Sequence, residues 1–126
     1  MAKYEYGGRN TRTYQKLHGF KKIVAWQKAS DLGYLINRAA GKFGPGYYRL
    51  VDQMHGAAIS VSGNIAEGYC QSSLGSYIRH CQIARGSLGE LGSYIQDCER
   101  WSLLAGEELD RILLVPLSSP IVPVVQ

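Results

Sequence analysis

The sequence contains no long apolar run and no leader-like N-terminus. A membrane-spanning helix needs about 20 consecutive apolar residues, whereas the longest apolar runs here are only a few residues long. The first stretch, MAKYEYGGRNTRTYQ, also lacks the apolar centre of a signal peptide. From these two absences we expect a cytoplasmic protein with no membrane partner.

Cysteine and histidine are scarce, and neither is arranged for metal binding. The three cysteines form no CxxC pair, so neither a zinc site nor a redox dithiol is predicted. Cys81 and Cys98 fall at apolar helix positions, and we interpret them as small buried side chains in a reducing compartment. His18, His55 and His80 share no ligand spacing and are interpreted as surface or boundary residues. No metal and no cofactor is predicted.

Apolar residues are abundant and follow a helical period. The chain has 126 residues, which suits one domain, and 45% are apolar, too many for a disordered chain. Steps of three or four between apolar positions predict four helices. Their approximate ranges are 20–43, 47–67, 74–100 and 107–115. Because the connections are short, neighbouring helices should be antiparallel. We therefore expect an all-α, up-down-up-down four-helix bundle with a short fourth helix, over residues 20–115.

The third helix has the most regular pattern, and helix breakers bound the others. Ser72 or Ser73 can cap its start. Its stripe alternates steps of four and three, which favours nearly antiparallel packing. The stripe comprises Tyr77, Cys81, Ala84, Leu88, Leu91, Ile95 and Cys98. The sequence Gly44-Pro45-Gly46 should stop the first helix, and Pro116 should stop the fourth.

The stretch NIAEG, residues 64–68, places an amide, a carboxylate and a glycine near the predicted end of the second helix. Asn64 and Glu67 are three apart and share one helix face. Catalysis would need a nucleophile with a base, or a second carboxylate, and no histidine lies within a few residues. We favour a structural role. Asn64 would donate to a free carbonyl at the helix end, Glu67 would accept from a free backbone amide, and Gly68 would form a left-handed cap.

Three glycines, at 86, 89 and 92, interrupt the third helix in the stretch RGSLGELG. Their spacing matches neither a dinucleotide-binding loop nor a P-loop, and no strand precedes them. Each mid-helix glycine costs about 1 kcal/mol relative to alanine. We expect close contact with the small-residue face of the second helix to compensate this cost. A flexible hinge is the alternative.

Positive charge is concentrated near the N-terminus. The net charge is +4, and residues 1–22 carry six basic residues against Glu5 alone, which is +5 (six minus one). A basic arm, residues 1–19, suits a polyanionic partner, although a solubilising tail would have the same composition. Further basic residues share one face of the first helix, where Asp31 and Leu35 interrupt them. The predicted nucleic-acid-binding residues are Arg9, Arg12, Lys16, Lys21, Lys22, Lys28, Arg38 and Lys42.

Three segments carry a family resemblance: VAWQKASDLGYLI, QMHGAAISVSGNIAEGY and YIRHCQIARGSLGELGSYI. In this order, over roughly residues 14–112, they closely resemble the bacterial four-helix bundle proteins encoded by intervening sequences in large-subunit ribosomal RNA genes. Accessory variability proteins of diversity-generating retroelements are more distantly similar. The residues that match the two family motifs, NIAEG and GSLxEL, include Asn64, Glu67, Gly68, Gly86, Ser87 and Glu90.

The resemblance implies a protein without enzymatic activity that assembles into a ring-like homopentamer. It also implies nucleic-acid binding, and possible pairing with a reverse transcriptase as in the retroelement relatives. The chain departs from the family at its end, where Pro116 and an apolar tail, residues 116–126, replace further turns of the fourth helix. Leu109, Ile112 and Leu113 should cover only part of the groove between the other helices. The tail or a neighbouring subunit should cover the rest.

Two functional hypotheses follow. The first is a non-enzymatic, oligomeric scaffold that binds RNA or DNA through its basic surface. The alternative is a protein–protein adaptor, or a functionless relic of an intervening sequence, without nucleic-acid binding. Salt-dependent binding to RNA or DNA discriminates between them. A small-molecule enzyme ranks third, because the sequence shows no acid–base pair, metal cluster or cofactor loop.

Overall fold

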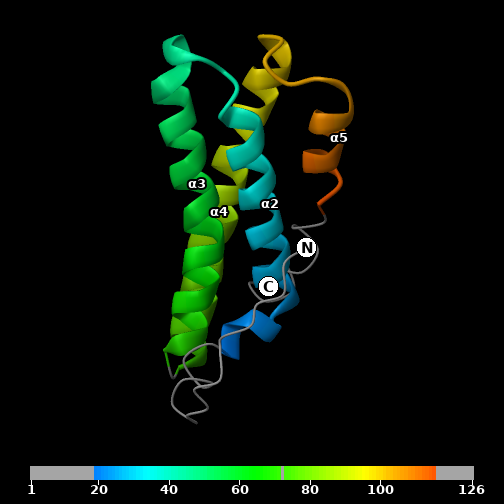
Figure 1. The fold of residues 1–126 in the computed structure, drawn as a ribbon. Helices are drawn as coiled ribbons and strands as arrows, with labels where there is room; N and C mark the ends of the chain where they lie inside the picture. The colour runs from blue at the N-terminus through cyan, green and yellow to red at the C-terminus, as the bar shows by residue number, and fades with distance from the viewer. Residues whose placement is uncertain (1–18, 72, 116–126) are drawn as a thin grey trace, which may run out of the picture.

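The computed structural model describes residues 19–71 and 73–115, and this part of the chain is helical without a strand (Figure 1). Four α-helices and two short 3-10 helices follow one another along the chain. They are η1 (Gly19–Lys22), α2 (Val24–Ala40), η2 (Pro45–Tyr47), α3 (Tyr48–Cys70), α4 (Leu74–Arg100) and α5 (Gly106–Leu113). The predicted all-α four-helix bundle with a short fourth helix is confirmed. The predicted arm, apart from Gly19, and the predicted tail lie outside the described residues.

The first helix is shorter at both ends than its apolar stripe predicts. Its predicted start forms the separate turn η1, and its predicted end, Lys42 and Phe43, forms tight turns back to Ala39 and Ala40. Gly44 follows with φ of 85°, a left-handed conformation that few side chains tolerate. Phe43 still packs against the core although it lies beyond α2. Burial therefore continues past the helix, which is why periodicity overestimates its length.

The second helix extends beyond its predicted end at Glu67. α3 continues through Gly68 to Cys70, and Gln71 then leaves the helix with an extended backbone. The predicted left-handed cap at Gly68 is therefore wrong, because Gly68 is a buried residue inside the helix. Ser73 accepts a hydrogen bond from the Ser76 amide at 3.1 Å, so the predicted cap of the next helix is confirmed at Ser73.

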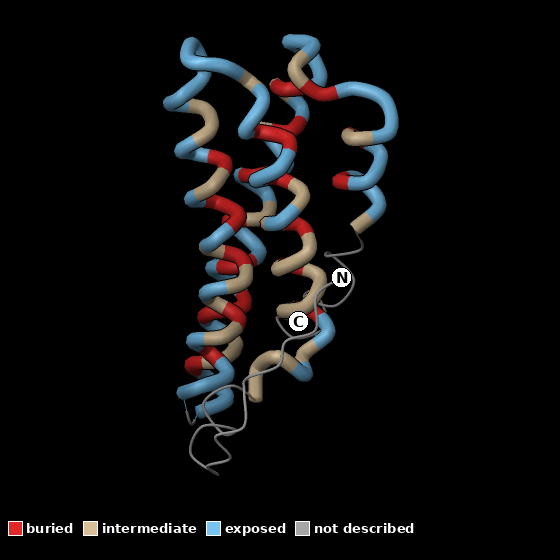
Figure 2. Tube along the Cα trace, in the orientation of Figure 1, coloured by how far each residue is buried: buried red, intermediate tan, exposed pale blue. Residues whose placement is uncertain are grey.

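The core runs along the inner faces of all four α-helices (Figure 2). Its most fully buried side chains are Ile36, Met54, Val61, Ile65, Leu91, Cys98 and Leu104. Cys81 and Cys98 are both buried and free, so the interpretation of these two thiols as small core residues is confirmed. The Cys98 Sγ lies 3.7 Å from the Met54 Sδ of α3.

The short helix α5 lies beside α2 and covers one end of the bundle (Figure 1). Leu109 and Ile112 enter the core, but Leu113 is 58% exposed and does not contribute as predicted. An ion pair between Lys42 Nζ and Glu108 Oε2, at 3.0 Å, joins the end of the first helix to α5. Within the described ranges, none of the helices combines the length and hydropathy of a membrane span.

Candidate functional site

Polar pairs join α3 to α4 at regular intervals along their contact. We call these six residues the polar seam. The hydrogen bonds are Tyr94–Gln53 at 3.3 Å, Ser60–Ser87 at 2.7 Å and His80–Glu67 at 2.6 Å. Successive members are seven residues apart on both helices, which is two turns of a supercoiled helix pair. The pairs therefore fix one antiparallel register along most of the α3–α4 contact.

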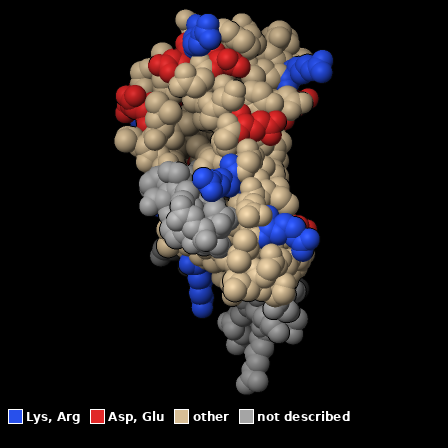
Figure 3. All heavy atoms as spheres, turned by 180° about the vertical axis from the view of Figure 1, so that it is seen from behind, with Lys and Arg blue, Asp and Glu red and all other residues tan. Residues whose placement is uncertain are grey.

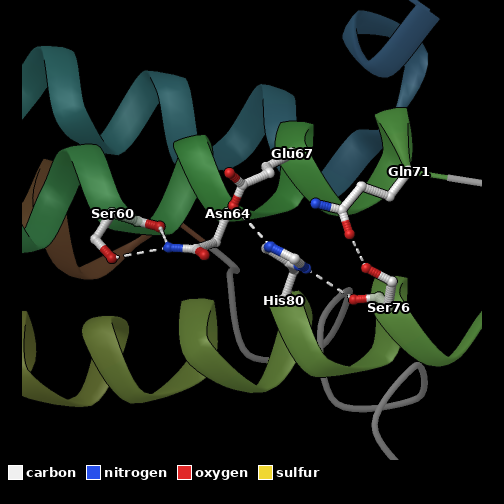
Figure 4. A network of polar contacts seen from close by, with 6 residues as sticks. All are labelled: Ser60, Asn64, Glu67, Gln71, Ser76 and His80. Carbon is white, nitrogen blue, oxygen red and sulfur yellow. Dashed lines mark hydrogen bonds and ion pairs between the residues drawn. The ribbon is translucent and has the colours of Figure 1, made fainter.

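Asn64 supports the middle pair of the seam. Its Nδ2 donates to the Ser60 backbone carbonyl at 2.8 Å and to the Ser60 Oγ at 3.0 Å (Figure 4). The predicted bond to a free carbonyl at the helix end is therefore wrong, because the carbonyl lies one turn back inside α3. Since Ser60 Oγ accepts from Asn64, its own hydroxyl hydrogen stays available for Ser87. Asn64 thus orients Ser60 across the seam.

Glu67 and His80 point toward one another across the last turns of α3 and the first turns of α4 (Figure 4). The His80 Nε2 lies 2.6 Å from Glu67 Oε2, and its Nδ1 lies 2.8 Å from the Ser76 carbonyl oxygen. The His80 side chain is only 11% exposed, so its interpretation as a surface or boundary residue is wrong. Glu67 pairs with an imidazole here, not with the predicted backbone amide.

Gly68 allows α4 to come close enough for this pair to form. A Cβ built at Gly68 would lie 2.8 Å from the His80 Cβ and 3.2 Å from the Tyr77 Cδ1. A side chain here would push α4 away from α3. The structure therefore requires a glycine at position 68 for the close approach of two helices, and not for the predicted left-handed cap.

The glycines of α4 behave in the opposite way. A Cβ built at Gly86, Gly89 or Gly92 would meet no atom within 4 Å. The predicted close contact with α3 is therefore wrong, because all three positions face away from it and are exposed. Ser87, the buried neighbour of Gly86, makes the contact with α3.

Glu90 also lies on α4, but its hydrogen-bond partner, Tyr94, lies on the same helix. Its Oε2 accepts from the Tyr94 hydroxyl at 2.9 Å. This hydrogen bond, with a smaller contribution from desolvation, raises the pKa of Tyr94 above its ordinary value. Glu90 thus holds the tyrosine that also reaches Gln53 across the seam.

The predicted basic residues fall into separate groups. Lys21 and Lys22 lie in η1 and Lys28 lies in the first half of α2, whereas Arg38 and Lys42 lie at the other end of that helix. There Lys42 pairs with Glu108, and Arg38 lies 5.9 Å above the Tyr34 ring. Arg9, Arg12 and Lys16 lie outside the described residues.

Charge is divided along the length of the bundle. We call residues 19–32, 60–71 and 73–86 the basic end, and residues 33–59 and 87–115 the acidic end. The basic end has five basic and two acidic residues, a net charge of +3. The acidic end has five basic and seven acidic residues, a net charge of −2. On the face drawn in Figure 3, the acidic side chains gather toward one end of the molecule.

Comparison with protein-family models finds one family that matches most of the chain. Residues 21–114 match the model of the 23S rRNA-intervening sequence protein family, a range that includes α2 to α5. The chain belongs to this family. No curated protein matches it. The distant similarity to retroelement accessory proteins stays a prediction.

Two features of this intervening-sequence protein bear on its chemistry. Both ring nitrogens of His80 face oxygen acceptors, so the ring contacts neither a hydroxyl nor a thiol as its hydrogen-bond partner. Burial raises the pKa of the Cys81 and Cys98 thiols, which keeps both sulfurs in their unreactive form near neutral pH. Among the described residues, no three potential ligands gather as a metal site would require.

Sequence reasoning missed His80 for a physical reason. His80 lies 13 residues after Glu67 and on a different helix. The two residues meet only because α3 turns back into α4 through a short connection. Spacing within one helix cannot reveal such a contact. The signal in the sequence that could have indicated it is the seven-residue interval between polar residues, which is the same on both helices.

Proposed function

We propose that this intervening-sequence protein is a non-enzymatic, oligomeric scaffold that binds RNA or DNA through its basic end. The observation that supports the proposal is the division of charge along the bundle. Five basic residues against two acidic ones lie at the end where the chain enters at Gly19. The preceding residues 1–18 add four basic residues against one acidic residue, a further +3.

A polyphosphate partner suits such a surface. Lysine and arginine side chains displace counterions from the phosphate backbone, which gives affinity without sequence preference. Lys22, Arg79 and Arg85 are exposed at the basic end and can contact phosphates. The family is named for 23S rRNA, so RNA is the first ligand to test.

Exposed apolar side chains support the oligomeric part of the proposal. Ile59 is 69% exposed, and Val24, Leu74 and Ile83 are also exposed. Burial of one aliphatic side chain stabilises a protein by about 1.5–3 kcal/mol, and a side chain left in water does not contribute this free energy. Val24 and Leu74 begin their helices at the end of the bundle that α5 does not reach. Further copies of the chain would cover this surface, and the family resemblance favours a pentamer.

Light scattering coupled to size exclusion tests the assembly. We expect a stable homo-oligomer at micromolar concentration, with a pentamer as the favoured state. A monomer that persists at this concentration contradicts the oligomeric scaffold.

Fluorescence anisotropy with labelled single-stranded RNA and duplex DNA tests the binding. The informative variant replaces Lys22, Lys28 and Arg79 of the basic end with glutamine. A matched control replaces Arg49, Arg100 and Arg111 of the acidic end with glutamine and removes the same charge. We expect the first variant to bind more weakly than the control. Equal loss in both variants would contradict a localised interface.

The adaptor or relic alternative differs in one outcome. It predicts no salt-dependent retention of either nucleic acid by the wild-type protein. Only the retroelement similarity implies a reverse transcriptase partner. This partner stays a prediction, and a separate pull-down experiment would test it.

A further inference from the structure

Exposed, uncharged residues border the middle pair of the polar seam, Ser60–Ser87. On α3, Gly56 and Gly63 each lie one turn from Ser60, and on α4 Ile83 lies one turn from Ser87. Residues one turn apart share a helix face, and Gly56, Gly63 and Ile83 are all exposed. They therefore lie beside the seam on its solvent side, away from the core.

Two further residues extend this surface. Ile59 lies on α3 between Gly56 and Gly63 and is 69% exposed, and Gly86 lies one turn after Ile83 on α4. We call these five residues, Gly56, Ile59, Gly63, Ile83 and Gly86, the outer patch. A Cβ built at any of its three glycines would meet no atom within 4 Å. The patch is therefore open on both helices.

The composition of the outer patch is unusual for a helix surface that faces water. From Met54 to Ala66, the exposed positions of α3 are only Gly56, Ile59 and Gly63. The solvent side of a helix usually carries charged or polar side chains. Glycine weakens a helix, and an exposed isoleucine contributes no burial, so neither residue type stabilises the single chain here. A partner packed on the patch would bury the isoleucines and use the close approach that glycine allows.

The outer patch suits a protein partner better than a polyanion. It contains no basic side chain to contact phosphates, and the acidic Glu90 lies one turn after Gly86. The 23 residues of α3, at 1.5 Å each, give the outer side of the α3–α4 pair a length of about 35 Å. Two helix diameters give it a width of about 20 Å. The resulting area of about 700 Å² is close to the roughly 800 Å² that each partner buries in a stable protein–protein interface.

We propose that the outer patch is a subunit interface, on which a second copy of this chain packs. The inference rests on the oligomeric part of the proposed function and names the surface that the assembly uses. A second copy can supply apolar groups, because Leu74 and Val24 are 72% and 55% exposed elsewhere on the chain. In a ring, one face of each copy packs against a different face of the next. The patch leaves η1 and α2 uncovered, so the same assembly can bind nucleic acid there.

Sedimentation equilibrium over the micromolar range tests the interface. Ile59→Asp places a carboxylate in the proposed contact, whereas the control Leu113→Asp places one on α5, at an exposed aliphatic position outside the patch. We expect Ile59→Asp to weaken association at least about tenfold, because the burial of one isoleucine is lost. Leu113→Asp should keep the wild-type mass. An Ile59→Asp protein that associates as tightly as the wild type overturns the proposal.

A glycine variant gives a readout that partial unfolding cannot imitate. Gly86→Gln improves the helix propensity of α4 but adds a side chain in the proposed contact. Gly92→Gln is the matched control, because a Cβ at Gly92 also meets no atom within 4 Å. Gly92 follows Ile83 by nine residues, which is two and a half turns, so it lies on the opposite side of α4. Gly86→Gln should associate more weakly than Gly92→Gln, and equal association of the two variants overturns the proposal.

The same measurements separate this inference from the proposed function. If the wild-type protein is a monomer at these concentrations, the oligomeric scaffold fails and the interface fails with it. If the wild type is an oligomer and Ile59→Asp keeps its mass but loses RNA binding, the patch contacts nucleic acid. That result overturns the interface while the oligomeric scaffold stands.

Discussion

At Gly68, a single missing side chain sets the distance between two helices. The position is buried, and the first atoms of His80 and Tyr77 fill the space where a Cβ would lie. Because α4 comes this close, Glu67 reaches His80 without leaving α3. The Glu67–His80 pair of the seam therefore depends on the absence of a side chain at Gly68.

Gly68→Ala should destabilise the protein by about 1–3 kcal/mol, because the new methyl group overpacks the helix contact. Gly63→Ala is the matched control, since Gly63 precedes Gly68 on the same helix and a Cβ there meets nothing within 4 Å. That variant should gain up to about 1 kcal/mol from better helix propensity. Urea melts of both proteins measure the difference, and equal effects would rule out the packing explanation.

Glu67→Ala should lower the free energy of unfolding by about 1 kcal/mol, since a side-chain hydrogen bond between α3 and α4 is lost at a partly exposed site. Thermal melts at matched pH measure it. His80→Ala should cost more, because it also removes a buried ring. A melting temperature that does not change in Glu67→Ala would show that the pair contributes nothing to the fold.

The sequence predicts which residues of the NIAEG stretch are structural, but not what they contact. Asn64, Glu67 and Gly68 are recognisable from their types and from the family motif. Their partners, Ser60 and His80, are set by the register between α3 and α4. A pattern within one helix carries no information about that register, so the predicted helix-end bonds were wrong.

At the scale of elements, α4 combines a regular buried stripe with an outer face that contains exposed glycines. The serine cap and the stripe together predicted the range of this helix closely, because the apolar positions of the stripe never slip. The same pattern could not show which way the glycines face relative to α3. Gly86 and Gly89 face open space, so they weaken the helix without improving its packing in the single chain.

Gly86→Ala and Gly89→Ala should each raise stability by several tenths to about 1 kcal/mol, because alanine restricts the unfolded chain and favours the helix. Denaturant melts on dilute protein measure this gain. If either substitution instead destabilises the protein, another surface must pack against this face of α4.

The short helix α5 was predictable from its acidic start and from Pro116, but its burial was predicted less well. Its eight residues make only two turns, so a small rotation decides which leucine enters the core. Leu109 is buried and Leu113 is exposed, although both belong to one apolar cluster in the sequence.

Leu109→Ala should therefore cost about 2–4 kcal/mol, the usual range for a buried leucine. Leu113→Ala should change the stability by less than about 0.5 kcal/mol, as surface substitutions usually do. Chemical denaturation of the two variants makes the comparison on one helix with one type of substitution. Similar losses in both would mean that α5 packs in another rotation.

At the scale of the whole molecule, the helices separate charge as well as bury apolar surface. The acidic end contains α5 and its ion pairs, Lys42–Glu108 and Arg111–Glu107. The basic end contains η1, the Glu67–His80 pair and the junction with residues 1–18. The sequence revealed the excess of positive charge near the N-terminus. Only the bundle shows that Arg79 and Arg85, far along the chain, lie at the same end.

The salt dependence of RNA binding tests the central claim most directly. For wild-type protein, the logarithm of the association constant should fall linearly with the logarithm of salt concentration. Replacing Lys22, Lys28 and Arg79 with glutamine should reduce the magnitude of that slope by about 2, since each phosphate contact to a single strand contributes about 0.7. The acidic-end control should keep the wild-type slope. Absence of any salt-dependent RNA or DNA binding by the wild-type protein near physiological ionic strength would contradict the account.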